Sequence, residues 1–127
     1  MKSGGGKRKG GIFENKIYDD IRAKDVWVRK NKGSGNTKDN AGDLETKEYL
    51  IECKHYKKIT QKNLLEWAKK IEGEAQRIDK VPLLICKENN KDIVVYYWLY
   101  IDDKAHDLGI SSISYDKWLN LCLYEVN

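Results

Sequence analysis

The chain has 127 residues, of which 40% are hydrophobic and 35% charged, with a formal net charge of +4 at pH 7. This length fits one domain with its own core, and the composition is that of a folded protein rather than a disordered one. The sequence contains no run of 18 apolar residues, which excludes a membrane-spanning helix. Its three cysteines form no C-x-x-C pair, which argues against a zinc cluster or a disulfide scaffold. We therefore expect a reducing, cytoplasmic compartment.

Basic residues are concentrated in the first third of the chain. Residues 1–40 carry 11 basic and 5 acidic side chains, a net charge of +6, whereas residues 81–127 carry a net charge of −3. This asymmetry predicts an anionic partner at the N-terminal side. Residues 1–11 are rich in glycine and lysine without an apolar segment behind them, so we expect a flexible basic arm rather than a secretory signal. Such an arm is either a solubilising tail or a phosphate-binding segment, and residues 12–127 form the single predicted domain.

The first predicted helix spans residues 12–23. Phe13, Ile17 and Ile21 recur every four residues there, which is the spacing of one helix face. Glu14 lies at the border of this apolar stripe. A short strand over 26–30 and a glycine-rich loop over 31–42 follow.

The rest of the chain alternates between strands and helices. We predict strands over 42–46 and 49–54, a helix over 61–79 capped by Thr60, strands over 81–86 and 93–101, and a last helix from Ser114 to Leu123. The strands after residue 80 are apolar nearly throughout, as in central strands or at a subunit interface. The order α-β-β-β-α-β-β-α predicts an α/β fold with a central mixed sheet flanked by helices.

The hairpin over residues 42–54 contains the most informative pattern. If residues 47–48 form a two-residue turn, Asp43 lies directly opposite Glu52, with Cβ atoms about 5 Å apart. Two carboxylates at that separation repel unless a cation lies between them, and Mg²⁺ accepts one or two carboxylates plus waters. A slip of one residue would turn Asp43 away and leave Glu45 as the substitute ligand.

Glu52 and Lys54 share one face of the second hairpin strand because side chains alternate along a strand. The plain alternative is that Asp43 is a turn residue and that Glu52 and Lys54 form a surface ion pair.

The ordered combination of these residues resembles the PD-(D/E)XK nuclease superfamily, most of all the archaeal and phage Holliday junction resolvases. The pattern consists of Glu14, then Gly33-Ser34-Gly35, then Asp43, then Glu52-Cys53-Lys54, within residues 7–87. Two positions depart from it. Gly42 stands where the superfamily motif has proline, and Asn15 follows Glu14 where resolvases often have arginine.

The resemblance implies a restriction-endonuclease-like fold and a set of catalytic roles. The implied ligands of Mg²⁺ or Mn²⁺ are Asp43, Glu52, the backbone carbonyl of Cys53 and, for a second ion or a water, Glu14. Lys54 would orient the attacking water and stabilise the transition state. Ser34 would donate its hydroxyl to a phosphate.

The resemblance also implies a substrate and an assembly. DNA, with a four-way junction as the leading form, would be cut symmetrically in recombination or repair by a homodimer with two sites. The expected location is cytoplasmic, with a host or a viral gene as the source. The basic residues expected to contact DNA are Lys7, Arg8, Lys9, Arg29, Lys30, Lys32, Lys57, Lys58 and Lys62. A repair or restriction nuclease, a non-catalytic nucleic-acid binding module and an interaction protein remain as alternatives.

Overall fold

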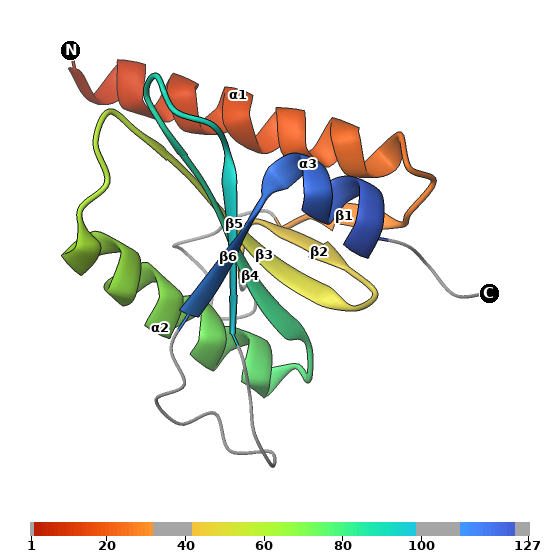
Figure 1. The fold of residues 1–127 in the computed structure, drawn as a ribbon. Helices are drawn as coiled ribbons and strands as arrows, with labels where there is room; N and C mark the ends of the chain where they lie inside the picture. Colours follow the sequence, from red (N-terminus) through yellow and green to blue (C-terminus); the bar gives the residue numbers. More distant parts are fainter. Residues whose placement is uncertain (1, 32–41, 99–109, 124–127) are drawn as a thin grey trace.

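The computed structural model describes residues 2–31, 42–98 and 110–123, with the side chains of residues 2–9 outside the description. Its six strands form one sheet in the order β1-β2-β3-β4-β5-β6 (Figure 1). The β3–β4 pair is parallel and the other neighbouring pairs are antiparallel. The predicted mixed α/β architecture is therefore confirmed.

Helix α1 (Lys2–Arg22) lies along one face of the sheet and buries Phe13, Ile17 and Ile21. It begins at Lys2, so the segment 2–11 is helical in the structure, and the prediction of a flexible arm is wrong for its backbone. Each residue added to an existing helix gains one hydrogen bond, so the helix that starts in the amphipathic segment extends backward even though five of residues 2–11 are glycines, which are poor helix formers.

The first three strands form a meander. Strands β1 (Val28–Lys30) and β2 (Leu44–Thr46) pair antiparallel, and β2 pairs with β3 (Tyr49–Tyr56). The predicted hairpin register is confirmed, with Leu44 opposite Ile51 and Glu45 opposite Leu50. The Thr46 hydroxyl accepts hydrogen bonds from the backbone N–H groups of Glu48 and Tyr49, and these bonds stabilise a turn whose own residues are poor turn formers.

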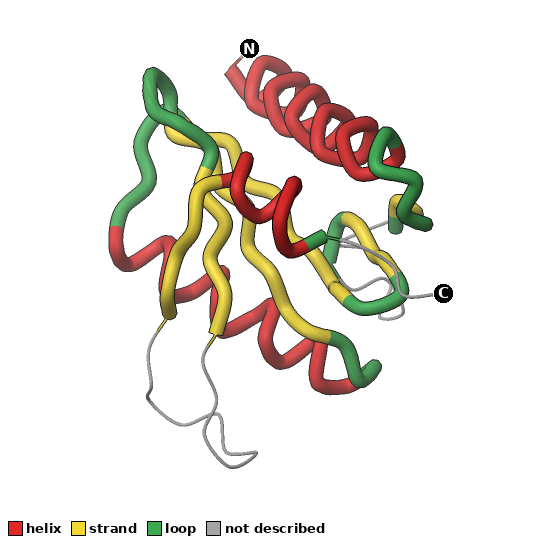
Figure 2. The backbone as a smooth tube through the Cα atoms, turned by 45° about the vertical axis from the view of Figure 1, so that its right-hand side comes forward, coloured by secondary structure: helices red, strands yellow, loops and turns green. Residues whose placement is uncertain are grey.

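A helix connects the two parallel strands. Helix α2 (Gln61–Arg77) follows β3 and returns the chain to β4 (Val81–Glu88). The Thr60 side chain accepts a hydrogen bond from the Asn63 N–H, which confirms the predicted cap. Ala68, Ile71 and Ala75 of α2 are buried against the sheet face opposite to α1, and Figure 2 shows the two helices on either side of the strands.

The C-terminal part adds a strand that the sequence analysis missed. Strand β5 (Val94–Trp98) pairs with β4 on one side and with β6 (Ile110–Ser114) on the other. The β6 sequence ISSIS contains three serines, and its two isoleucines are its only residues of the β-branched or aromatic type that marks a strand. Its pairing places β5 inside the sheet, which accounts for the apolar character of β5 without a second subunit.

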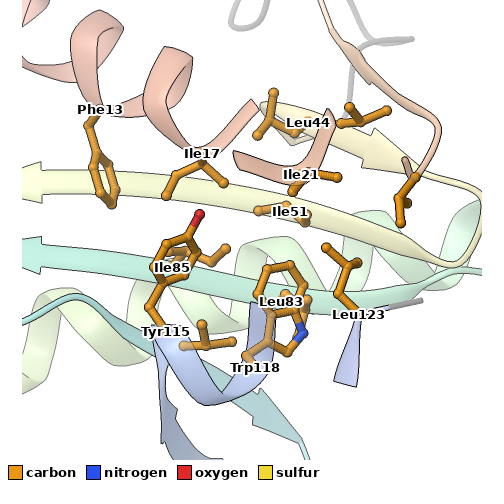
Figure 3. Packing of buried hydrophobic residues seen from close by; sticks show 13 residues of the cluster. Phe13, Ile17, Ile21, Leu44, Ile51, Leu83, Ile85, Tyr115, Trp118 and Leu123 are labelled. Carbon is orange, nitrogen blue, oxygen red and sulfur yellow. The ribbon is translucent and has the colours of Figure 1, made fainter. Parts of the chain in front are cut away.

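The last helix is short. Helix α3 (Tyr115–Lys117) is capped by Ser114, whose side chain accepts from the Lys117 N–H. It continues into a π-helical turn, η1 (Trp118–Cys122). Tyr115 and Trp118 pack beside α1 in the larger core cluster (Figure 3). Among the described residues, no helix is long and apolar enough to cross a membrane.

Candidate active site

The β2–β3 hairpin brings Asp43 beside β3. The Asp43 N–H donates to the Ile51 carbonyl at 2.8 Å, and Asp43 Oδ2 accepts from the Cys53 N–H at 2.8 Å. Strand pairing ends at Leu44 and Ile51, so these bonds hold Asp43 beside β3 but are not part of the pairing that was predicted to put it directly opposite Glu52. The Asp43 carboxylate is thereby anchored to the β3 backbone at the residue between Glu52 and Lys54.

Gly42 makes the corner that aims Asp43. Its φ is +66°, and a Cβ at this position would lie 2.9 Å from Leu50 Cγ. The Gly42 N–H donates to Glu74 Oε1 of α2 at 3.1 Å. Because proline cannot adopt a positive φ or donate a hydrogen bond, this geometry requires the glycine that replaces the proline of the superfamily motif.

Glu52 and Lys54 form an ion pair on the α2 face of β3. Lys54 Nζ lies 3.1 Å from Glu52 Oε2, and the two side chains are only 23% and 13% exposed. The ion pair of the plain alternative is therefore present, but it is largely withdrawn from water rather than placed on the surface. Lys54 Nζ also lies 5.2 Å from the centroid of the Trp67 ring on α2.

Burial perturbs the acidic groups of the site. It raises the pKa of Asp43 to about 6 even though the hydrogen bond from Cys53 opposes the shift. Burial and the negative charge of Asp43 raise the pKa of Glu52 to about 7, with Lys54 acting in the opposite direction. Burial also raises the pKa of Glu14, and Glu52 adds to that shift. Three carboxyl groups thus share one poorly solvated region.

The amine of Lys54 stays charged in this environment. Burial alone would lower its pKa, but the charge of Glu52 and the hydrogen bond to Glu52 outweigh burial and raise the pKa above its ordinary value. The site therefore combines repelling carboxylates with one held ammonium group.

The donor set fits a small divalent cation. Within residues 2–31, 42–98 and 110–123, no group of three or more His, Cys, Asp or Glu side chains is arranged to hold a metal. Mg²⁺ does not need such a cage, since it binds through one or two carboxylates and keeps several waters. Asp43 and Glu52, desolvated and mutually repelling, are the pair that a cation would stabilise.

Comparison with known proteins supports this interpretation. The family described as "Phage putative PDDEXK endonuclease" matches residues 5–120. The chain belongs to this endonuclease family. The predicted PD-(D/E)XK resemblance is confirmed. A comparison with curated proteins gave no match.

A solved structure shares the fold of the endonuclease. It is the 1.6 Å structure of Hjc, described as a Holliday junction resolvase from an archaeal hyperthermophile, Archaeoglobus fulgidus. The match has a TM-score of 0.53 and 11% sequence identity, and it covers 84% of this chain and 89% of that chain. The restriction-endonuclease-like fold class is thus confirmed.

The endonuclease uses Glu45 for structure. Glu45 forms ion pairs with Arg29 at 3.0 Å and with Lys80 at 2.7 Å. Burial alone would raise the pKa of Glu45, but hydrogen bonds from Lys80 and Arg29 lower it below the ordinary value. Glu45 is therefore paired with basic side chains of the protein itself. Its predicted use as a metal ligand applied only to a hairpin shifted by one residue, and the observed register is not shifted.

The other predicted DNA contacts lie in different surroundings. Lys30 contacts the Asn15 side-chain oxygen and lies 5.0 Å from the ring centroid of Tyr18. Three exposed lysines follow β3 and open α2, namely Lys57, Lys58 and Lys62. Ser34 and Lys32 lie outside the described residues, as do the side chains of Lys7, Arg8 and Lys9.

Helix α2 contributes site residues that the sequence analysis missed. Trp67 contacts Lys54, Glu74 holds Gly42, and the positive charge of Lys70 lowers the pKa of both Asp43 and Glu52. Residues 67, 70 and 74 follow the spacing i, i+3, i+7 and so share one face of the helix. That spacing was visible in the sequence beside the buried stripe of α2.

Proposed function

We propose that the protein is a Mg²⁺-dependent endodeoxyribonuclease that cuts four-way DNA junctions. The observation that carries the proposal is the buried Asp43–Glu52 pair with the Lys54 ammonium held 3.1 Å from Glu52. Membership of the endonuclease family supports the reaction class, and the fold shared with Hjc supports a branched substrate. Mn²⁺ can substitute for Mg²⁺ because it accepts the same oxygen ligands.

Each site residue has a role that its surroundings support. Asp43, Glu52 and the Cys53 carbonyl would hold the ion, and Glu14 would hold a second ion or a water. A divalent ion bound there would lower the pKa of a water molecule that it binds and would neutralise negative charge on the phosphate. Lys54 keeps its proton beside Glu52, so it can orient the attacking water and stabilise charge on the phosphate. In-line hydrolysis would leave a 5′-phosphate and a 3′-hydroxyl.

Basic residues around the site complete the DNA interface in this proposal. Lys57, Lys58 and Lys62 are exposed where β3 leads into α2, close to Lys54 in sequence and therefore suited to contact the phosphates that flank the cut. Arg29, Lys30 and Lys32 come shortly before Ser34 in the sequence, and Lys7, Arg8 and Lys9 belong to the N-terminal half of α1. All of these residues are proposed phosphate contacts.

The proposed active unit is a homodimer of a single nuclease domain in the cytoplasm, where the DNA lies. Two symmetric cuts across one junction require two sites related by a two-fold axis. Light scattering in solution measures the mass directly, and a monomer that still makes paired nicks would contradict this part of the proposal.

The deciding experiment is a cleavage panel. The protein is incubated with Mg²⁺ and labelled four-way junction, flap, linear duplex and single strand, and the nicks are mapped. We expect paired symmetric nicks on the junction and no cleavage in EDTA. Cleavage of linear duplex at one sequence would indicate a restriction-type enzyme, and binding without cleavage would indicate a non-catalytic module.

Matched variants test the site within the same panel. Asp43→Asn and Glu52→Gln are expected to abolish cleavage while DNA binding persists or tightens, because a negative charge near the phosphate is removed. Glu48→Gln, at an exposed carboxylate of the β2–β3 turn, is the control and should cleave normally. Cleavage by the Asp43 and Glu52 variants at the wild-type rate would contradict the site assignment.

A further inference from the structure

Trp67 lies against the ammonium group on which the proposed chemistry depends. The centroid of its ring is 5.2 Å from Lys54 Nζ, while the same nitrogen lies 3.1 Å from Glu52 Oε2. The Lys54 ammonium is therefore held between a carboxylate on its own strand and an aromatic ring on the helix that covers that strand.

The ring itself is fixed from two sides. Trp67 packs against the buried cluster of Ala68, Leu84 and Cys86. Tyr56 contacts it with ring centroids 5.0 Å apart and an interplanar angle of 36°. Because side chains two residues apart point the same way along a strand, Lys54 and Tyr56 both reach the α2 face of β3, where Trp67 lies.

A lysine held by one ion pair alone is poorly positioned. Its four-carbon stem has high rotamer freedom, and a single carboxylate can be approached from several directions. An aromatic face attracts an ammonium group through the ring quadrupole, with tryptophan the strongest partner, and this attraction is larger where water is excluded. The second contact therefore restricts the ammonium to one position beside Glu52.

We propose that Trp67 is a positioning residue that holds the Lys54 ammonium beside Glu52 through a cation–π contact. The proposal rests on the catalytic role proposed for Lys54. The proposal assigns Trp67 a role beyond core packing. Packing alone needs only an apolar side chain and would not require an aromatic ring.

The test compares two substitutions that differ in the aromatic face. Trp67→Phe keeps a ring, whereas Trp67→Leu keeps an apolar side chain without one. Under single-turnover conditions with the four-way junction and Mg²⁺, we expect Trp67→Phe to stay within roughly 3-fold of wild type and Trp67→Leu to lose roughly tenfold in rate. Junction affinity in Ca²⁺ should be unchanged in both. Trp27→Leu, at an exposed tryptophan before β1, is the control.

A double-variant cycle separates positioning from loss of packing. In a Lys54→Ala background, Trp67→Leu should cause no further loss of rate, because the ammonium is already absent. Equal rates for Trp67→Leu and Trp67→Phe, or a full additional loss in the Lys54→Ala background, would overturn the proposal. Thermal unfolding of each variant confirms that the fold is retained.

An NMR measurement makes the inference independent of cleavage. The εCH₂ protons of Lys54, identified by their absence in Lys54→Ala, should be shifted upfield by the ring and should move to the position of exposed lysines in Trp67→Leu. An unshifted wild-type signal would refute the contact. A shifted signal in a protein that cuts no DNA would retain the positioning and refute the proposed function instead.

Discussion

Replacing Asp43 with asparagine is expected to stabilise the metal-free fold while it abolishes cleavage. Asparagine keeps a side-chain oxygen that can accept from the Cys53 N–H, a bond of 2.8 Å in the wild type, but it carries no charge. The change therefore removes the repulsion and desolvation of the Asp43 carboxylate and leaves its anchoring bond in place.

The magnitude follows from the pKa of Asp43. Burial raises this pKa from 3.8 to about 6, so the folded protein binds the proton more tightly than the unfolded chain does. The contribution of Asp43 to the stability of the wild type must then fall as the pH rises from about 4 to about 6, and it stays lower above that range. The full shift corresponds to about 3 kcal/mol at 1.36 kcal/mol per pH unit. We expect Asp43→Asn to be about 2–3 kcal/mol more stable at pH 8, with a gain that shrinks toward zero near pH 4.

The assay is urea unfolding in EDTA, followed by circular dichroism from pH 4 to pH 8. Asp19→Asn, the same change at an exposed position of α1, is the control and should not reproduce the gain in stability at pH 8. An Asp43→Asn protein that is less stable than wild type at pH 8, or a difference that is constant with pH, would refute the electrostatic reasoning. Adding Mg²⁺ at 100 times its Kd should then stabilise the wild type by about 2.7 kcal/mol and have little effect on the variant.

Two further predictions concern the framework of the hairpin. Gly42→Ala should destabilise the protein by about 1–3 kcal/mol, because the φ of Gly42 is +66° and the new Cβ would lie 2.9 Å from Leu50 Cγ. The control Gly73→Ala, on an open surface of α2, should instead stabilise the protein by about 0.5–1 kcal/mol. Equal changes in the free energy of unfolding for the two variants, measured in urea, would contradict this prediction. Glu45→Gln should cost about 1 kcal/mol at pH 7, since the hydrogen bonds from Lys80 and Arg29 lower the pKa of Glu45 against the effect of burial. That cost should shrink on acidification, as Glu45 becomes protonated in the wild type. A cost that does not change on acidification would show that packing, not charge, is lost.

The hairpin was predictable because two local rules determine it. Side chains alternate every residue along a strand, and a two-residue turn sets which residues face each other. These rules place Asp43 beside β3 without any knowledge of the rest of the fold, and the register of β2 and β3 agrees. The prediction used only these local rules, and the hydrogen bonds of Asp43 with Ile51 and Cys53 hold it beside β3.

The missed features depend on contacts between distant segments. Strand β6 has a weak strand sequence and is held by pairing with β5, so its own residues gave little indication of it. The segment 2–11 was interpreted from its glycines, although its helix continues from the amphipathic part of α1. The role of Trp67 depends on where α2 crosses β3, which no periodicity in α2 determines.

The topology explains why α2 supports the site. Strands β3 and β4 are parallel, so their connection must cross over one face of the sheet, and here it does so as a helix. Glu52 and Lys54 point toward that same face. The helix therefore has to accommodate two charged side chains while it buries its apolar stripe, and it does so through Trp67 over the ammonium and Glu74 at Gly42. The helix that the chain connection requires thus also holds the charged groups of the site. Substitutions at its residues that contact the site should therefore affect cleavage more than they affect the stability of the fold.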